Sequence, residues 1–204
     1  MSIARMNLSE LLESLGEKTP TPGGGAATGM TAATAAALAL MVVRFSRGKN
    51  SLAAHEGMLR NAEAMLDRSR TEFLRLADAD AAAYEALHAL WRLGEDDPKR
   101  QAEIPLAARG AIAVPHEVME RCDSLAALLE ELVGRTSRSL ASDLAIAAIL
   151  TDAAARGAAW NVRVNLPLLS SRTEARRVAK EAGEVRRRVR KRCGAVEKRC
   201  RESK

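Results

Sequence analysis

A proline- and glycine-rich stretch, Thr19–Gly25, opens a run without any charged residue that continues to Val43. This run constrains the fold more than any other feature of the chain. The rings of Pro20 and Pro22 disfavour helical geometry at the residue before each, so the stretch enters in an extended conformation. Its glycines can take positive φ and can lie close to another chain or to a ligand. We therefore expect a glycine loop that leads into an apolar helix.

The function of this loop stays open at the level of the sequence. The unpaired N–H groups at a helix start suit an anionic group or a polar ring, but a turn above a tightly packed helix needs no ligand. The glycine spacing matches neither GxxxxGK[ST] nor GxGxxG, so a nucleotide loop is not supported.

The uncharged run is also long enough to cross a membrane. Its opening prolines and glycines, and its Ala, Thr and Gly content, transfer poorly into lipid. We therefore expect a fully buried helix of a globular bundle and no membrane partner.

The composition favours an all-α fold in a single domain, residues 1–204. Aromatic residues make up 2% of the chain and hydrophobic residues 47%, so the core must consist of Ala, Leu, Val, Ile and Met. Much Ala, Leu, Arg and Glu argues for helices rather than strands. Apolar periodicity and capping residues predict a bundle of about six mostly long helices, at residues 8–16, 25–47, 50–92, 98–133, 139–165 and 172–201.

Two further features refine this bundle. Pro105 and Pro115 lie inside the fourth helix, where each should kink or split it. In the second helix a stripe of small residues recurs every four positions and would let another helix approach closely; its members are Gly25, Gly29, Ala33 and Ala37. We expect a homodimer in which two chains pack such helices together.

The net charge of +6 is concentrated in the last helix. Residues 172–204 carry 14 Lys and Arg against 5 Asp and Glu, a net +9, whereas the rest of the chain has a net −3. Basic clusters of this kind either form a solvated face or bind phosphates. Because stacking aromatics are almost absent, we do not expect nucleic-acid binding.

The cysteines and histidines do not form a recognisable metal or disulfide pattern. Cys122, Cys193 and Cys200 contain no CxxC pair, which argues against a disulfide framework or zinc site and favours the reducing cytoplasm. No HExxH or similar pair exists. We expect no metal.

Polar side chains inside the alanine-rich fifth helix are the best functional candidates, because buried polar groups need partners. Helix capping alone could explain Ser142 and Asp143, and a structural hydrogen bond could explain Asn161 and Asn165. Asp143 and Asn161 are 18 residues apart, which is five helical turns and about 27 Å. They share a face but cannot touch one atom within one chain, which favours a site at an interface.

Several motifs in order resemble the cyclodeaminase/cyclohydrolase family up to Leu169. They are Thr19–Ala27, Met41–Val43, Gly48-Lys49, Asp80–Tyr84, Val114-Pro115, Ser142-Asp143 and Asn161–Leu166. The resemblance implies an all-helical homodimer or higher assembly that acts on tetrahydrofolate carrying a one-carbon unit. One reaction hydrolyses 5,10-methenyltetrahydrofolate to 10-formyltetrahydrofolate, and the other cyclises 5-formiminotetrahydrofolate and expels ammonia. No cofactor beyond the folate substrate is implied.

This chemistry suggests roles for the candidate residues. The methenyl bridge is cationic, so a carboxylate beside it would stabilise the charge and take a proton from water. Asp143 is the first candidate for that carboxylate, Asp80 is a weaker one, and Lys49 is the candidate cation for acid–base work or for the glutamate carboxylates of the substrate. The remaining candidates would contact the substrate: Pro22, Gly23, Gly24, Gly25, Ser142, Asn161 and Asn165.

Three positions depart from the family pattern. The family usually carries Gly-Lys-Lys where this chain has Gly48-Lys49-Asn50, and Gly-Asn-x-Asn where it has Thr136–Ser139. Arg44 replaces a frequent asparagine. Two alternatives to an enzyme therefore remain, an inactive scaffold with the family fold and a helical protein that binds nucleic acid through its basic last helix. The sequence does not choose between hydrolase and deaminase.

Overall fold

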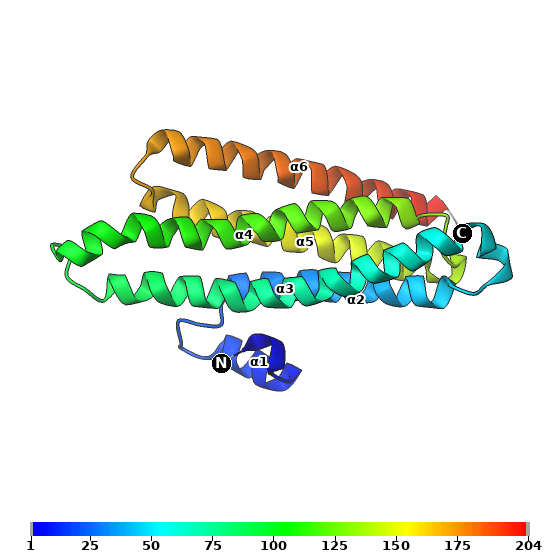
Figure 1. The fold of residues 1–204 in the computed structure, drawn as a ribbon, viewed down its shortest axis with the longest axis horizontal. Helices are drawn as coiled ribbons and strands as arrows, with labels where there is room; N and C mark the ends of the chain where they lie inside the picture. Colours follow the sequence, from blue (N-terminus) through cyan, green and yellow to red (C-terminus); the bar gives the residue numbers. More distant parts are fainter. Residues whose placement is uncertain (1, 203–204) are drawn as a thin grey trace.

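A computed structural model describes residues 2–202 and shows an elongated bundle of α-helices (Figure 1). The six α-helices and the absence of strands among these residues confirm the all-α prediction. The α-helices are α1 (Leu8–Gly16), α2 (Gly24–Ser46), α3 (Glu56–Trp91), α4 (Pro98–Leu132), α5 (Ala141–Asn165) and α6 (Arg172–Glu202). Four 3₁₀ helices accompany them, at Ile3–Arg5, Asn50–His55, Arg138–Leu140 and Leu166–Leu168.

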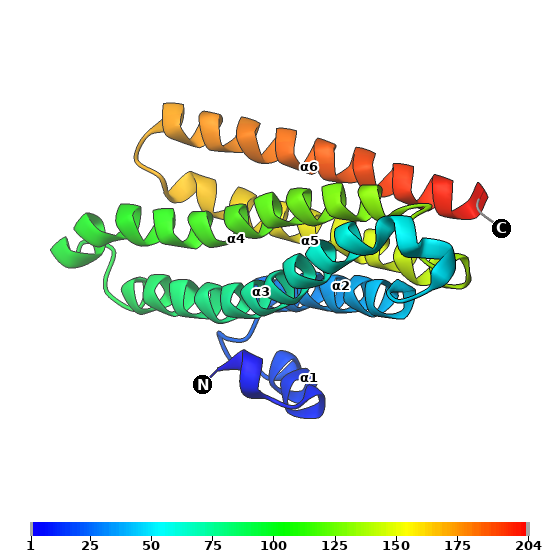
Figure 2. The same cartoon turned by 45° about the vertical axis from the view of Figure 1, so that its right-hand side comes forward.

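The long helices lie side by side, and α1 sits outside the bundle beneath α2 and α3 (Figures 1 and 2). Helix α5 packs against α2, α4 and α6, whereas α3 packs against α2 and α4. The core that they enclose is built mainly from Ala, Leu and Val side chains, as the shortage of aromatic residues predicts.

Local capping chemistry sets the helix starts. Asn7 and Glu10 form the reciprocal hydrogen bonds of a capping box at α1. Asp97 accepts hydrogen bonds from two N–H groups at the start of α4, where Pro98 is the first residue. The predicted third and fifth helices start later than expected, because 3₁₀ helices occupy their first residues.

Helix α4 is not split. It runs through both Pro105 and Pro115 without interruption, so that alternative of the sequence prediction is wrong. Each proline removes the N–H that would bond the carbonyl four residues earlier. For Pro115 that carbonyl belongs to Ala111, and it accepts a hydrogen bond from the side chain of Asn165 on α5. A side chain from a neighbouring helix thus compensates for the missing donor.

The small-residue stripe of α2 is used within the chain. A Cβ at Gly29 would lie 3.0 Å from the carbonyl oxygen of Phe73 and from the Cβ of Ala77, both on α3. Helix α2 is long and apolar enough to span a membrane, but 61% of its most apolar window is buried in the bundle. The close contact between α2 and α3 accounts for Gly29 without a second chain, whereas a dimer interface along the rest of the stripe stays a prediction.

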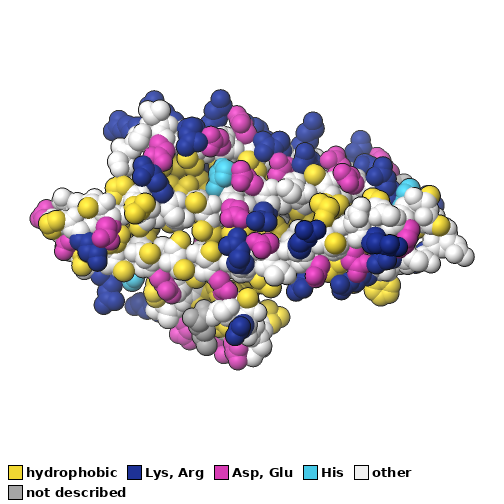
Figure 3. Space-filling view, viewed as in Figure 1, with side chains coloured by type: hydrophobic (Ala, Val, Ile, Leu, Met, Phe, Trp, Pro, Cys, Tyr) yellow, Lys and Arg dark blue, Asp and Glu magenta, His cyan; other side chains and the backbone are white. Residues whose placement is uncertain are grey.

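Helix α6 is two-sided. Its buried stripe packs on α4 and α5 and consists of Ala182, Val185, Val189, Cys193, Val196 and Cys200. This burial agrees with a packing role for the two cysteines. Lys and Arg side chains gather along the outer edge of the molecule over α6 (Figure 3). Some of them hold the helix in place, since Arg188 and Arg192 both pair with Asp123 of α4.

Candidate active site

The glycine loop and the start of α2 form one wall of a cavity of about 250 Å³. Residues from α3, α4 and α5 complete it, so four helices meet there. The lining residues are Pro20, Thr21, Gly23, Gly24, Gly25, Asp80, Ala81, Tyr84, Ala111, Asn161, Val164 and Asn165. A hydrogen bond of 2.8 Å from Thr21 Oγ1 to Glu85 Oε1 ties the loop to α3. Six of the residues predicted from the sequence therefore surround one space.

Gly25 is needed for close approach. A Cβ at this position would fall 1.9 Å from Oδ2 of Asp80, so only glycine leaves room for that carboxylate. Gly23 has extended geometry, with φ −133° and ψ −155°. The glycines with positive φ are Gly48 and Gly134. The loop glycines therefore do not use the positive φ that glycine permits, whereas the close approach that the sequence also allowed is present at Gly25.

Asp80, on α3, holds a partly buried carboxyl group against the start of α2. Burial raises its pKa from 3.8 to about 6. It has no hydrogen bond or ion pair with another residue of the range 2–202. A carboxyl group with a pKa close to neutral can both accept and donate a proton under physiological conditions. Asp80 is therefore the acid–base candidate of this cavity.

Asn161 contributes a hydrogen-bond donor without an acceptor. Its Nδ2 atom is buried and has no partner within the described part of the chain. Leaving such a donor unpaired costs about 1–3 kcal/mol, a cost that a bound acceptor would remove. Asn161 lines the cavity beside Asp80, so the cavity offers a proton-transfer group and a free amide donor together.

Asn165 has a structural task. Its Nδ2 donates to the carbonyl oxygen of Ala111 at 3.2 Å and to that of Asn161 at 3.0 Å. The first of these bonds ties α5 to α4 where Pro115 leaves a carbonyl free, and the second lies within α5. The interhelix hydrogen bond that the sequence left open is thus present for Asn165. The amide nitrogen is used, and the side-chain oxygen is what remains for a ligand.

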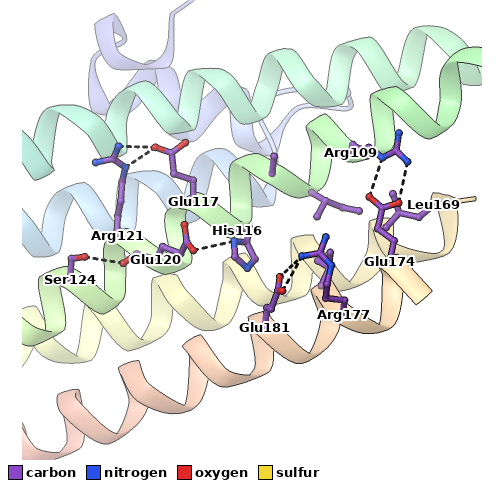
Figure 4. A pocket seen from close by; sticks show the side chains of 13 residues that line it. Arg109, His116, Glu117, Glu120, Arg121, Ser124, Leu169, Glu174, Arg177 and Glu181 are labelled. Carbon is purple, nitrogen blue, oxygen red and sulfur yellow. Dashed lines mark hydrogen bonds and ion pairs between the residues drawn. The ribbon is translucent and has the colours of Figure 1, made fainter. Parts of the chain in front are cut away.

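A larger hollow of about 660 Å³ lies between α4 and α6 and contains none of the predicted site residues. Its charged side chains pair with one another (Figure 4). Arg109 pairs with Glu174 at 3.0 Å, and Arg177 pairs with Glu181 at 2.9 Å. These pairs leave the walls largely neutralised, so the smaller cavity at the start of α2 is the better candidate.

A family model described as formiminotransferase-cyclodeaminase matches residues 7–184. The chain belongs to this family. The formimidoyltransferase-cyclodeaminase of Sus scrofa is 31% identical over 169 residues, which are 81% of this chain and 31% of that protein. The methenyltetrahydrofolate cyclohydrolase of Methylorubrum extorquens is 29% identical over 178 residues, 85% of this chain and 86% of that protein.

The fold of the family is also seen in a crystal structure. The formiminotetrahydrofolate cyclodeaminase of Thermotoga maritima superimposes with a TM-score of 0.90 at 29% identity, covering 97% of both chains. By contrast, the chain spans only about a third of the length of the formimidoyltransferase-cyclodeaminases that it matches.

Three other residues predicted from the sequence lie at the far end of the bundle. Asp143 is in the first turn of α5, 18 residues and about 27 Å from Asn161. Lys49 follows the opposite end of α2 from the glycine loop, is exposed, and its Nζ donates to Ser137 Oγ at 2.8 Å. Ser142 is exposed beside Asp143. Within one chain, none of these three residues lines the cavity.

Sequence reasoning omitted other lining residues. Tyr84 lies one helical turn after Asp80, and that spacing could have placed it in the site. Ala111 and Val164 gave no signal, because an apolar residue at a cavity wall looks like any core residue. Pro22 was predicted but does not line the cavity. No group of His, Cys, Asp and Glu among residues 2–202 could hold a metal ion.

Proposed function

We propose that this chain is a one-carbon folate enzyme. Its substrate would be 5,10-methenyltetrahydrofolate, hydrolysed to 10-formyltetrahydrofolate, or 5-formiminotetrahydrofolate, cyclised with loss of ammonia. The observation that carries the proposal is that Asp80 and the unpartnered amide of Asn161 line one cavity of a chain in the formiminotransferase-cyclodeaminase family. No cofactor beyond the folate is part of the proposal, and its compartment is the cytoplasm.

Asp80 would carry the proton transfers. In the hydrolase reaction, water adds to the cationic methenyl carbon, and the carboxylate takes a proton from that water. The same carboxyl then returns the proton to the ring nitrogen as the C–N bond breaks, and the hydroxyl group of the adduct loses its proton to solvent as the formyl C=O forms. In the cyclodeaminase reaction it would protonate the departing nitrogen as ammonia leaves. A pKa of about 6 suits both directions.

The charge of the substrate strengthens this assignment. An ionised Asp80 beside the methenyl cation gains a favourable interaction that is strong in a site with little water. Asn161 would donate its free N–H to an oxygen or nitrogen acceptor of the pterin and so fix the position of the ring in the cavity. Gly23 and Gly24 would offer backbone contacts from the start of α2.

We further propose a homodimer formed through α5. The exposed stripe of this helix carries Arg156 and Arg163 in its C-terminal half, whereas its N-terminal half presents two large apolar side chains, with 46–47% of each exposed. These are Ile146 and Ile149. Apolar faces of this kind mark interaction sites, and a second copy is the partner that completes the catalytic constellation.

An antiparallel pairing of two α5 helices would bring opposite ends together. Asp143 and Asn161 share one face of α5, and Ala153 lies close to the midpoint between them. A two-fold axis near Ala153 would place Asp143 of the partner subunit beside the cavity of the first. Lys49 of the partner subunit would lie near the same cavity and serve as a second acid–base group. Both family reactions could then use residues from two chains.

A spectrophotometric assay with each of the two folates tests the function. Turnover of either one by the purified protein supports the proposal and decides between hydrolase and deaminase. Absence of turnover with both folates would instead favour the inactive scaffold that the sequence departures allow.

A further inference from the structure

A second groove, of about 510 Å³, lies beside the candidate active site between α5 and α6. Small residues keep it open on the α6 side, namely Ala179, Ala182 and Gly183. Its floor is apolar. Three arginines line it, and no acidic side chain does so among the described residues; the arginines are Arg156, Arg163 and Arg186.

The guanidinium groups of this groove are poorly neutralised. Arg186 has no hydrogen bond or ion pair with another described residue. Arg163 lies over the ring of Trp160, 5.1 Å from its centroid, which holds the side chain without cancelling its charge. Arg156 reaches Asp152 at 3.9 Å, the outer limit of an ion pair. The groove is therefore a concave, positively charged site with an aromatic edge.

The groove and the cavity share two turns of α5. Asn161 and Val164 line the cavity, whereas Trp160 and Arg163 line the groove. The ridge between the two spaces carries Trp160 and Val164, each 62% exposed. A helix with its side chains is about 10–12 Å across, so an elongated ligand held in the cavity can cross the ridge and reach the arginines.

We propose that this groove binds the glutamyl carboxylates of the folate substrate, with the aminobenzoyl ring lying against Trp160. The inference rests on the proposed function and names a part of the substrate that the cavity is too small to hold. The planar fork of an arginine matches a carboxylate with two parallel hydrogen bonds. Trp160 offers an exposed face for ring stacking. Within one chain these arginines, rather than Lys49, would bind the glutamyl carboxylates, because Lys49 lies at the far end of the bundle.

Steady-state kinetics with the double variant Arg163→Gln/Arg186→Gln tests the role of the groove. Loss of two charge-assisted hydrogen bonds should raise KM by at least about tenfold. Since neither arginine lines the reacting cavity, kcat should stay within about twofold. Arg201→Gln makes the same change at an exposed position in the last turn of α6 and should leave both constants unchanged. A double variant with wild-type KM would overturn the inference while leaving the proposed function intact.

A binding measurement judges the groove independently of turnover. The chain has two tryptophans, so Trp91→Phe leaves Trp160 as the reporter. Titration with p-aminobenzoyl-glutamate should quench its fluorescence saturably, and the double arginine variant should abolish the quenching. Unchanged quenching in that variant, or none in the Trp91→Phe parent, would overturn the inference. If the wild-type protein turns over neither folate, the proposed function fails and this titration still decides what the groove binds.

Discussion

The carboxylate of Asp80 occupies the space that a Cβ at Gly25 would need, 1.9 Å from the position of that atom. This relationship explains why a glycine opens α2 opposite α3. It also explains the raised pKa of Asp80, because the backbone of α2 shields the carboxyl group from water.

Gly25→Ala should displace the Asp80 carboxylate and lower kcat by about tenfold or more, since a misplaced acid–base group loses most of its effect. The fold should survive, because a side-chain end can rotate away. Gly24→Ala is the matched control, as its Cβ would meet Asn161 Oδ1 at an ordinary 3.8 Å. Equal kcat values for the two variants would contradict the proposed position of Asp80.

Gly29→Ala should affect the stability of the fold, in contrast to Gly25→Ala. Its Cβ would meet the backbone carbonyl of Phe73 at 3.0 Å, and a backbone cannot rotate aside. We expect a loss of about 1–3 kcal/mol in the free energy of unfolding, measured by urea denaturation. A stability equal to that of the wild type would show that α2 and α3 are less closely packed than the structure indicates.

The raised pKa of Asp80 predicts a pH-dependent stability. The folded protein binds the proton more tightly than the unfolded chain, so stability decreases as the pH rises from about 4 to about 6. Asp80→Asn has no proton to lose and should be more stable than the wild type above pH 6. The difference should vanish below about pH 4. Urea denaturation at several pH values measures it, and a constant difference would contradict the burial of this carboxyl.

Asn165 and Pro115 should be energetically coupled. Asn165→Ala removes the donor to Ala111 and should cost about 1–2 kcal/mol of stability. In a Pro115→Ala background a backbone N–H can bond the same carbonyl, so the same substitution should cost clearly less. A double-mutant cycle measures the coupling. Additive effects would show that the Asn165 hydrogen bond does not compensate for the proline.

The shared site predicts complementation between two inactive variants. Asp80→Asn and Asp143→Asn each disable both sites of a homodimer. After subunit exchange, a mixed dimer contains one site with both native carboxylates, so about a quarter of wild-type activity should return. Ala153→Arg places a charge near the proposed two-fold axis and should give monomers in sedimentation. No recovery of activity, or an active monomer, would contradict the shared site.

Much of the fold could be predicted from local signals. Asn7, Asp97 and the apolar stripe of α6 act through neighbours in sequence, and the structure has them as expected. Pro115 could not be interpreted in this way, because the donor that compensates for it comes from Asn165, 50 residues later. Helix periodicity shows that a position is apolar but does not show which other helix it meets.

Only part of the candidate site could be predicted from the sequence, because contacts between helices decide the rest. The sequence named Gly25, Asp80 and Asn161, and the structure places them around one cavity. The sequence analysis ranked Asp143 above Asp80, because a Ser-Asp pair at a helix start is visible in the sequence whereas the burial of a carboxyl group is not. The pKa of Asp80 depends on the start of α2, more than fifty residues away. Of the groove arginines, Arg186 belongs to the basic last helix, where a solvated face was one interpretation, and only the packing of α6 on α5 brings it near Arg156 and Arg163.

Turnover of 5,10-methenyltetrahydrofolate and 5-formiminotetrahydrofolate by wild type and Asp80→Asn, measured side by side, tests the central claim most directly. A general acid–base group contributes about a hundredfold or more to the rate. We therefore expect Asp80→Asn to lower kcat at least about a hundredfold on whichever folate the wild type converts, with its helical circular dichroism unchanged. A folded Asp80→Asn protein that retains wild-type kcat would show that the cavity at the start of α2 is not where the chemistry occurs.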